Sequence, residues 1–107
     1  MLTDSDYQHI KELKSILKNK YGSLITKILC YGSRVSTQNQ NTDFDIAIIT
    51  SQKLKWEKED EISDVLFYYG LQNDILFDEK YFSEKEFTEI YSSMPFISEI
   101  KKYGIAI

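Results

Sequence analysis

Two aspartates lie one residue apart in the middle of the chain, in the segment Asp43-Phe44-Asp45. The apolar and polar residues that follow predict a strand over Phe44–Ile49, and successive side chains of a strand point to opposite faces. Asp43 and Asp45 are therefore expected on one face. Two like charges held together favour a divalent cation, and Mg²⁺ binds one or two carboxylates while it keeps water and substrate phosphates as further ligands. The spacing thus predicts a magnesium site.

A segment with the chemistry of phosphate binding precedes these aspartates, and its residues are Gly32, Ser33 and Arg34. Gly32 has no Cβ, so its backbone can approach a phosphate closely. Ser33 offers a hydroxyl and a backbone N–H, and Arg34 offers a cationic fork. Phosphate-binding groups beside a carboxylate metal site are the equipment for phosphoryl or nucleotidyl transfer, in which a second metal ion lowers the pKa of the attacking hydroxyl.

Such sites usually contain a third carboxylate. Asp74 opens the next predicted strand, with apolar residues after it, and is the first candidate. It could bind the second metal or act as the general base. Asp78 has the same strand parity and remains a rival.

Taken singly, each motif also has a purely structural explanation. Gly32-Ser33 fits a turn at a strand end. The Asp43–Asp45 pair fits a solvated strand edge, Asp74 fits a surface acid, and Arg34 fits a solvated loop cation. Their order and spacing between two apolar strands favour a functional site.

The pattern Gly32-Ser33, nine residues, then Asp43-Phe44-Asp45 resembles the signature of the DNA polymerase β-like nucleotidyltransferase superfamily, over roughly residues 25–77. The chain resembles the minimal nucleotidyltransferases of this superfamily, which implies one domain over residues 1–107 and a palm fold. The resemblance implies that Gly32 and Ser33 bind a triphosphate and that Asp43 and Asp45 hold Mg²⁺ ions. It also implies that Asp74 assists deprotonation of the acceptor.

Minimal members of this family are often antitoxins encoded beside a HEPN-domain ribonuclease toxin. The resemblance implies transfer of a nucleoside monophosphate, AMP from ATP, to an acceptor hydroxyl such as a tyrosine of that toxin. Two alternatives stay open. The chain could neutralise a partner by occlusion without catalysis, or it could modify a small molecule such as an aminoglycoside.

Several elements must position these residues. Apolar spacing predicts helices and strands in alternation, hence an α/β (α+β) fold with a small mixed sheet flanked by helices. The C-terminal Ile105-Ala106-Ile107 is expected either to pair as an edge strand of this domain or to meet a partner. The expected elements are a helix over 4–21, a strand over 25–31, a polar loop over 33–42 with at most a helical turn, a strand over 44–49, a helix over 54–69 closed by Gly70, a strand over 74–82, a helix start at Ser83-Glu84-Lys85-Glu86, and a last helix from Pro95 to Gly104.

Composition limits the remaining classes of protein. The 107 residues carry a net charge of −4, which argues against direct DNA binding because a nucleic-acid backbone requires a basic face. A single Cys30 and a single His9 argue against a disulfide framework, a zinc finger and a His-rich metal site. No apolar run has the length of a membrane span, and the first residues do not resemble a signal peptide. A cytoplasmic protein is expected, with homo- or hetero-oligomers left open.

Overall fold

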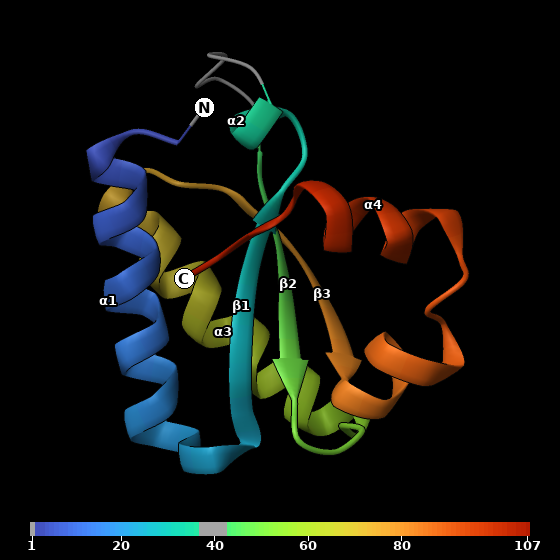
Figure 1. Ribbon diagram of the computed structural model, residues 1–107. Helices are drawn as coiled ribbons and strands as arrows, with labels where there is room; N and C mark the ends of the chain where they lie inside the picture. Colours follow the sequence, from blue (N-terminus) through green and yellow to red (C-terminus); the bar gives the residue numbers. More distant parts are fainter. Residues whose placement is uncertain (1, 37–42) are drawn as a thin grey trace.

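The computed structural model describes residues 2–36 and 43–107 (Figure 1). The sheet has four strands in the order β3-β2-β1-β4, and helices flank it. The α+β class with a small mixed sheet is therefore confirmed. In chain order the elements are α1 (Asp4–Tyr21), η1 (Gly22–Leu24), β1 (Ile25–Tyr31), α2 (Ser33–Ser36), β2 (Phe44–Thr50), α3 (Trp56–Asn73), β3 (Phe77–Ser83), the π-helical turn η2 (Glu86–Ile90), α4 (Pro95–Tyr103) and β4 (Ile105–Ala106).

The sheet is mixed because its three pairings differ in direction. Strands β1 and β2 are antiparallel, and β4 pairs with the other edge of β1, also antiparallel. Strand β3 is parallel to β2, and α3 makes the crossover between them. A parallel pair needs such a long connection, whereas antiparallel strands do not. The N-terminal end of β2 therefore lies beside the C-terminal end of β1 and the N-terminal end of β3.

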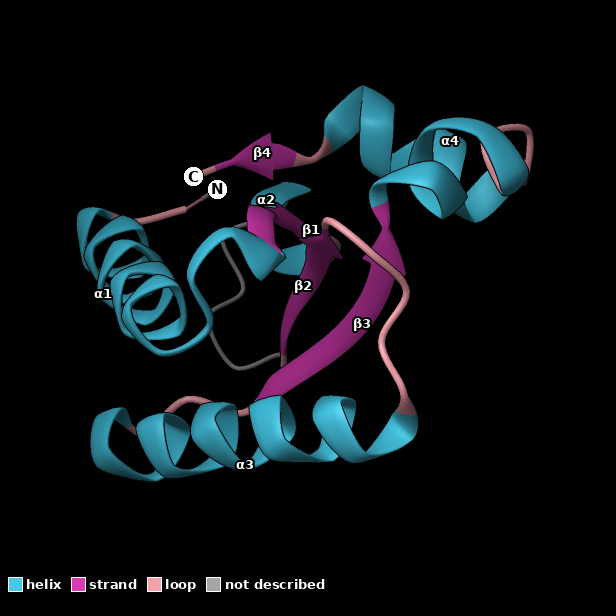
Figure 2. Ribbon diagram, turned by 90° about the horizontal axis from the view of Figure 1, so that it is seen from below, coloured by secondary structure: helices cyan, strands magenta, loops and turns pink. Residues whose placement is uncertain are grey.

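Side-chain alternation along β2 divides the apolar core between the two faces of the sheet. Phe44, Ile46 and Ile48 join the core against α1 and α3. Ala47 and Ile49 join a smaller core that includes residues of η2 and α4. Figure 2 shows α3 on one side of the sheet and α4 on the other. The predicted alternation is confirmed, and it places Asp45 on the α4 face.

Several local predictions are also confirmed. Helix α1 begins and ends where the apolar stripe predicts. Ser83 and Glu86 form the predicted capping box: the Glu86 N–H donates to Ser83 Oγ at 3.1 Å, and the Ser83 N–H donates to Glu86 Oε1 at 2.9 Å. Pro95 begins α4 and Gly104 caps it. The C-terminal residues pair with β1, so they dock on their own sheet.

The end of α3 differs from the prediction. The helix runs over Trp56–Asn73, past Gly70, and Asp74 is its cap in the left-handed conformation at φ 56° and ψ 46°. The Ile75 N–H donates to the Gly70 carbonyl at 2.9 Å, and a Cβ on Gly70 would collide with the Ile75 carbonyl oxygen. Gly70 is thus required because the chain folds back onto it. The third strand starts at Phe77, so the prediction that Asp74 lies on a strand is wrong.

Within residues 2–36 and 43–107, none of the helices combines the length and the apolar character that a membrane crossing requires.

Candidate functional site

The C-terminal end of β1 turns sharply at Gly32, which has φ +81°. A residue with a side chain adopts this conformation at a cost, whereas glycine does not. A second constraint is steric, because a Cβ on Gly32 would collide with Oδ2 of Asp45. The Asp45 carboxylate therefore packs directly against the Gly32 backbone. The structure brings together two of the residues that the sequence predicts for the site.

Asp45 has a second carboxylate beside it. In the parallel pairing of β2 with β3, Asp45 is in register with Asp78. The pKa of Asp45 is raised above its ordinary value, mainly by burial and then by the charge of Asp78 and a hydrogen bond with it, while Asp43 adds a smaller repulsion. Lys80 acts in the opposite direction on Asp45, and its Nζ lies 3.4 Å from Oδ1 of Asp78. The α4 face of the sheet thus carries an incompletely compensated negative charge.

Tyr31 borders the same carboxylates. It is in register with Asp45 across the β1–β2 pair. Burial raises the pKa of its phenol to about 12, and the charges of Asp45 and Asp78 add to this effect. At neutral pH the Tyr31 hydroxyl is therefore a neutral hydrogen-bond donor close to two carboxylates. Sequence reasoning missed Tyr31 and Lys80, although Tyr31 immediately precedes Gly32.

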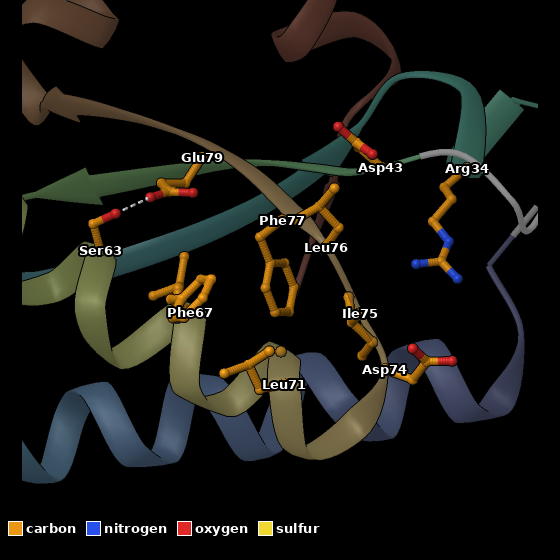
Figure 3. A pocket seen from close by; sticks show the side chains of 12 residues that line it. Arg34, Asp43, Ser63, Phe67, Leu71, Asp74, Ile75, Leu76, Phe77 and Glu79 are labelled. Atoms are coloured by element: carbon orange, nitrogen blue, oxygen red, sulfur yellow. Dashed lines mark hydrogen bonds between the residues drawn. The ribbon is translucent and has the colours of Figure 1, made fainter.

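Asp74 lies elsewhere. It contributes to a cleft of about 730 Å³ on the α3 side of the sheet, which Arg34 and Asp43 also line. Figure 3 shows Asp74 at one edge of this cleft, near the Arg34 guanidinium, and Asp43 at another edge with its carboxylate turned away from Asp74. The register of β3 places Asp78, and not Asp74, next to Asp45. The carboxylate beside Asp45 is therefore Asp78, the rival that strand parity identified.

Arg34 follows Ser33 in the short helix α2, and its guanidinium contacts the N-terminus of α1. Its Nη2 lies 3.7 Å from Oδ1 of Asp6, and both side chains are almost fully buried. The guanidinium also lies over the Phe44 ring, 4.7 Å from its centroid. Asp6 is held in turn by a capping box with Thr3. Arg34 thus links α1 to the core face of β2, which is a structural role that the sequence did not indicate.

Ser33 begins α2 directly after the Gly32 turn, and the Val35 N–H donates to the Gly32 carbonyl at 3.2 Å. The predicted loop therefore starts with a helical turn over Ser33–Ser36, as expected. The rest of that loop, residues 37–42, lies outside the described residues.

The carboxylates near Gly32 are oxygen ligands of the kind that Mg²⁺ binds. In the described part of the chain, no group of three or more His, Cys, Asp or Glu side chains is arranged to hold a metal ion. Asp45 and Asp78 nevertheless contact each other, and Asp43, which immediately precedes β2, adds its charge. One or two carboxylates are what Mg²⁺ takes from a protein when phosphates and water complete its shell. The residues therefore fit an ion that is shared with a phosphorylated substrate.

No protein-family model matches the chain, and neither a curated protein nor a solved structure matches it significantly.

Proposed function

We propose that this protein is a Mg²⁺-dependent nucleotidyltransferase with a polymerase β-like palm. It would transfer a nucleoside monophosphate, AMP from ATP in the first instance, to an acceptor hydroxyl. The observation that carries the proposal is the contact between the Gly32 turn and Asp45, with Asp78 in register on the neighbouring strand. This contact places a backbone that can approach phosphate beside carboxylates whose repulsion a cation relieves.

Each residue then has a defined role. Gly32 and Ser33 bind the β- and γ-phosphates through backbone N–H groups and the Ser33 hydroxyl. Asp43 and Asp45 hold Mg²⁺, with Asp78 beside them. When bound, Mg²⁺ supplies positive charge that orients the triphosphate and offsets charge developing on it. Lys80, whose Nζ lies 3.4 Å from Oδ1 of Asp78, offsets part of the charge of that carboxylate.

The transfer is a single displacement at phosphorus. The acceptor oxygen forms a bond to the α-phosphorus, the bond from this phosphorus to the α,β-bridging oxygen breaks, and pyrophosphate leaves with the electron pair. The acceptor proton passes to the Asp78 carboxylate and from there to solvent. We assign this role to Asp78 in place of Asp74 because Asp78 adjoins Asp45 and its side chain is half exposed. Asp74, the cap of α3, has no such neighbour in the β-sheet register.

The acceptor is proposed to be a side chain of a partner protein. The resemblance to minimal nucleotidyltransferases suggests a HEPN-type toxin, with this chain as its antitoxin in the cytoplasm. Four large apolar side chains on α3 and after it support a protein partner, because they are 57–66% exposed and exposed apolar patches mark interaction surfaces. They are Phe67, Tyr68, Leu71 and Leu76.

The first experiment is calorimetric titration with α,β-methylene-ATP, with and without Mg²⁺. Wild type should bind the ATP analogue only when Mg²⁺ is present. Mg²⁺ should no longer promote binding of the analogue to Asp45→Asn. Asp78→Asn should lose transfer to the acceptor, whereas the matched variant Asp74→Asn should retain it. Absence of Mg²⁺-dependent binding by a folded wild type would refute the proposal.

The second candidate function is neutralisation of a partner by occlusion, which the same exposed apolar side chains favour. Cells carrying the partner toxin distinguish the two. Rescue by Asp45→Asn as complete as rescue by wild type would favour occlusion. Rescue that needs an intact Asp45 would favour catalysis.

A further inference from the structure

A separate groove of about 360 Å³ lies between α2 and α4, on the opposite side of the sheet from the cleft of Figure 3. Its walls are mainly apolar, and three aromatic residues contribute to them: Tyr31, Phe96 and Tyr103. Gly32 also lines the groove, and Glu99 is its acidic residue. Small-molecule sites have this character, because apolar walls bury the ligand and a few polar groups orient it.

The aromatic rings of α4 stand exposed on a helix that is otherwise well anchored. Phe96, Glu99 and Tyr103 follow one another at i, i+3 and i+7, so they form one stripe of the helix. Their neighbours Ile97 and Ile100 are buried, whereas Phe96 is 40% exposed and Tyr103 is 58% exposed. The Phe96 ring meets Tyr31 edge to face, with centroids 5.6 Å apart, which fixes its orientation. The folded chain therefore leaves ring surface available along this groove.

The groove is continuous with the candidate active site. Gly32 lines the groove and also touches the Asp45 carboxylate. Tyr31 lines the groove and is in register with Asp45 across the β1–β2 pair. A nucleotide whose phosphates lie at Gly32 must place its ribose and base within one nucleoside length of that residue. The groove is a mainly apolar, aromatic space that adjoins Gly32.

We propose that this groove binds the base of the nucleotide, with Phe96 and Tyr103 as the stacking surfaces and Glu99 as the residue that reads its edge. The inference rests on the proposed function and adds to it the substrate specificity of the site. Aromatic side chains stack on any base, so they supply affinity without selectivity. A carboxylate accepts hydrogen bonds from exocyclic amino groups, which adenine and cytosine carry and uracil lacks. The groove therefore selects a base with an amino group, adenine among them, over uracil.

The test compares two probes, α,β-methylene-ATP and inorganic tripolyphosphate, both with Mg²⁺. Tyr103→Ala removes a ring that is mostly exposed, so the variant protein should fold normally. Phe96→Leu is a second substitution, which removes the ring but keeps an apolar side chain. The matched control is Trp56→Ala, an exposed aromatic at the start of α3 that lies outside both proposed binding surfaces. Loss of one stacking partner should lower the affinity for the ATP analogue about tenfold. Affinity for tripolyphosphate should not change, and the control should alter neither affinity.

The outcomes separate this inference from the proposed function. If wild type binds both probes and neither α4 variant lowers the affinity for the ATP analogue, the groove is not the base site. The proposed function then stands. An equal loss of affinity for both probes would also overturn the inference, because the substitution would then affect phosphate binding and not base binding. If wild type binds neither probe, the proposed function fails and the inference fails with it. For Glu99, wild type should prefer the ATP analogue over the UTP analogue, and Glu99→Gln should reduce that preference. Equal affinities in wild type would refute the role of Glu99.

Discussion

The repulsion between Asp45 and Asp78 predicts that a single neutral substitution makes the metal-free protein more stable. Both carboxylates occupy directly paired positions on β2 and β3, and the pKa of Asp45 is raised by burial and by its partner. Asp45→Asn removes one charge and keeps an amide that can donate a hydrogen bond to Asp78. The variant should therefore unfold at a higher temperature than wild type at neutral pH.

The size of the effect follows from the pairing. Like charges directly opposite on neighbouring strands cost up to about 1 kcal/mol, and the half exposure of Asp78 favours the lower part of that range. A gain of about 0.2–0.5 kcal/mol corresponds to a rise in the unfolding midpoint of roughly 1–4 °C for a domain of this size. Substitutions of charged site residues commonly stabilise a protein in this way, at the expense of function.

The pH dependence has a definite sign. A carboxyl group whose pKa is raised on folding binds its proton more tightly in the native state. Its favourable contribution is complete below the ordinary pKa of aspartate and is lost as the pH rises through the raised pKa of the folded state. The stability difference between Asp45→Asn and wild type should therefore be largest at neutral pH and should disappear in acid.

The assay is thermal unfolding followed by circular dichroism, with chelator and then with Mg²⁺. Mg²⁺ should raise the midpoint of wild type, because a ligand present at 100 times its dissociation constant adds about 2.7 kcal/mol, and it should have little effect on Asp45→Asn. Asp60→Asn, at an exposed position of α3, is the matched control and should change neither midpoint. In the double variant with Asp78→Asn, the second substitution should add little, since the repulsion is already removed. A metal-free Asp45→Asn that is less stable than wild type at neutral pH would refute this reasoning.

Three further predictions concern the residues around this pair. Gly32→Ala should lower the free energy of unfolding, measured with urea, by about 1–3 kcal/mol, because the new Cβ meets Asp45 and the residue has a positive φ. The variant should also lose nucleotide binding, and a Gly32→Ala protein as stable as wild type would contradict the geometry. Asp6→Asn should destabilise by about 1–3 kcal/mol, since it weakens the ion pair of the buried Arg34, and an unchanged urea midpoint would show that this pair is unimportant. The Tyr31 phenol should titrate with a pKa of about 12, obtained as the difference between the ultraviolet titrations of wild type and Tyr31→Phe because the chain has eight tyrosines. Asp45→Asn should lower this pKa, and an unchanged value would mean that the carboxylate charge does not reach the phenol.

The local physics of the chain determined many of its elements. Residues a few positions apart decide a helix stripe, a strand alternation or a capping box, so the sequence predicted α1, the two faces of β2 and the Ser83–Glu86 box. For the same reason it placed Asp43 and Asp45 in the pattern from which the site is proposed, next to the Gly32-Ser33 turn.

Only the tertiary structure determined the features that depend on contacts between segments far apart in the chain. The sequence predicted that the helix ends at Gly70, but α3 continues to Asn73 and Asp74 is its cap. Glycine is needed at position 70 because the chain after the helix folds back against it. The choice of Asp78 as the neighbour of Asp45 depends on the parallel register of β3 against β2, which strand parity allowed but did not select. Arg34 pairs with Asp6 because the folded chain brings α2 beside the N-terminus of α1, and the aromatic groove exists only because α4 returns to β1. Pairings between residues far apart in the chain are set by packing of the whole domain, and no local pattern encodes them.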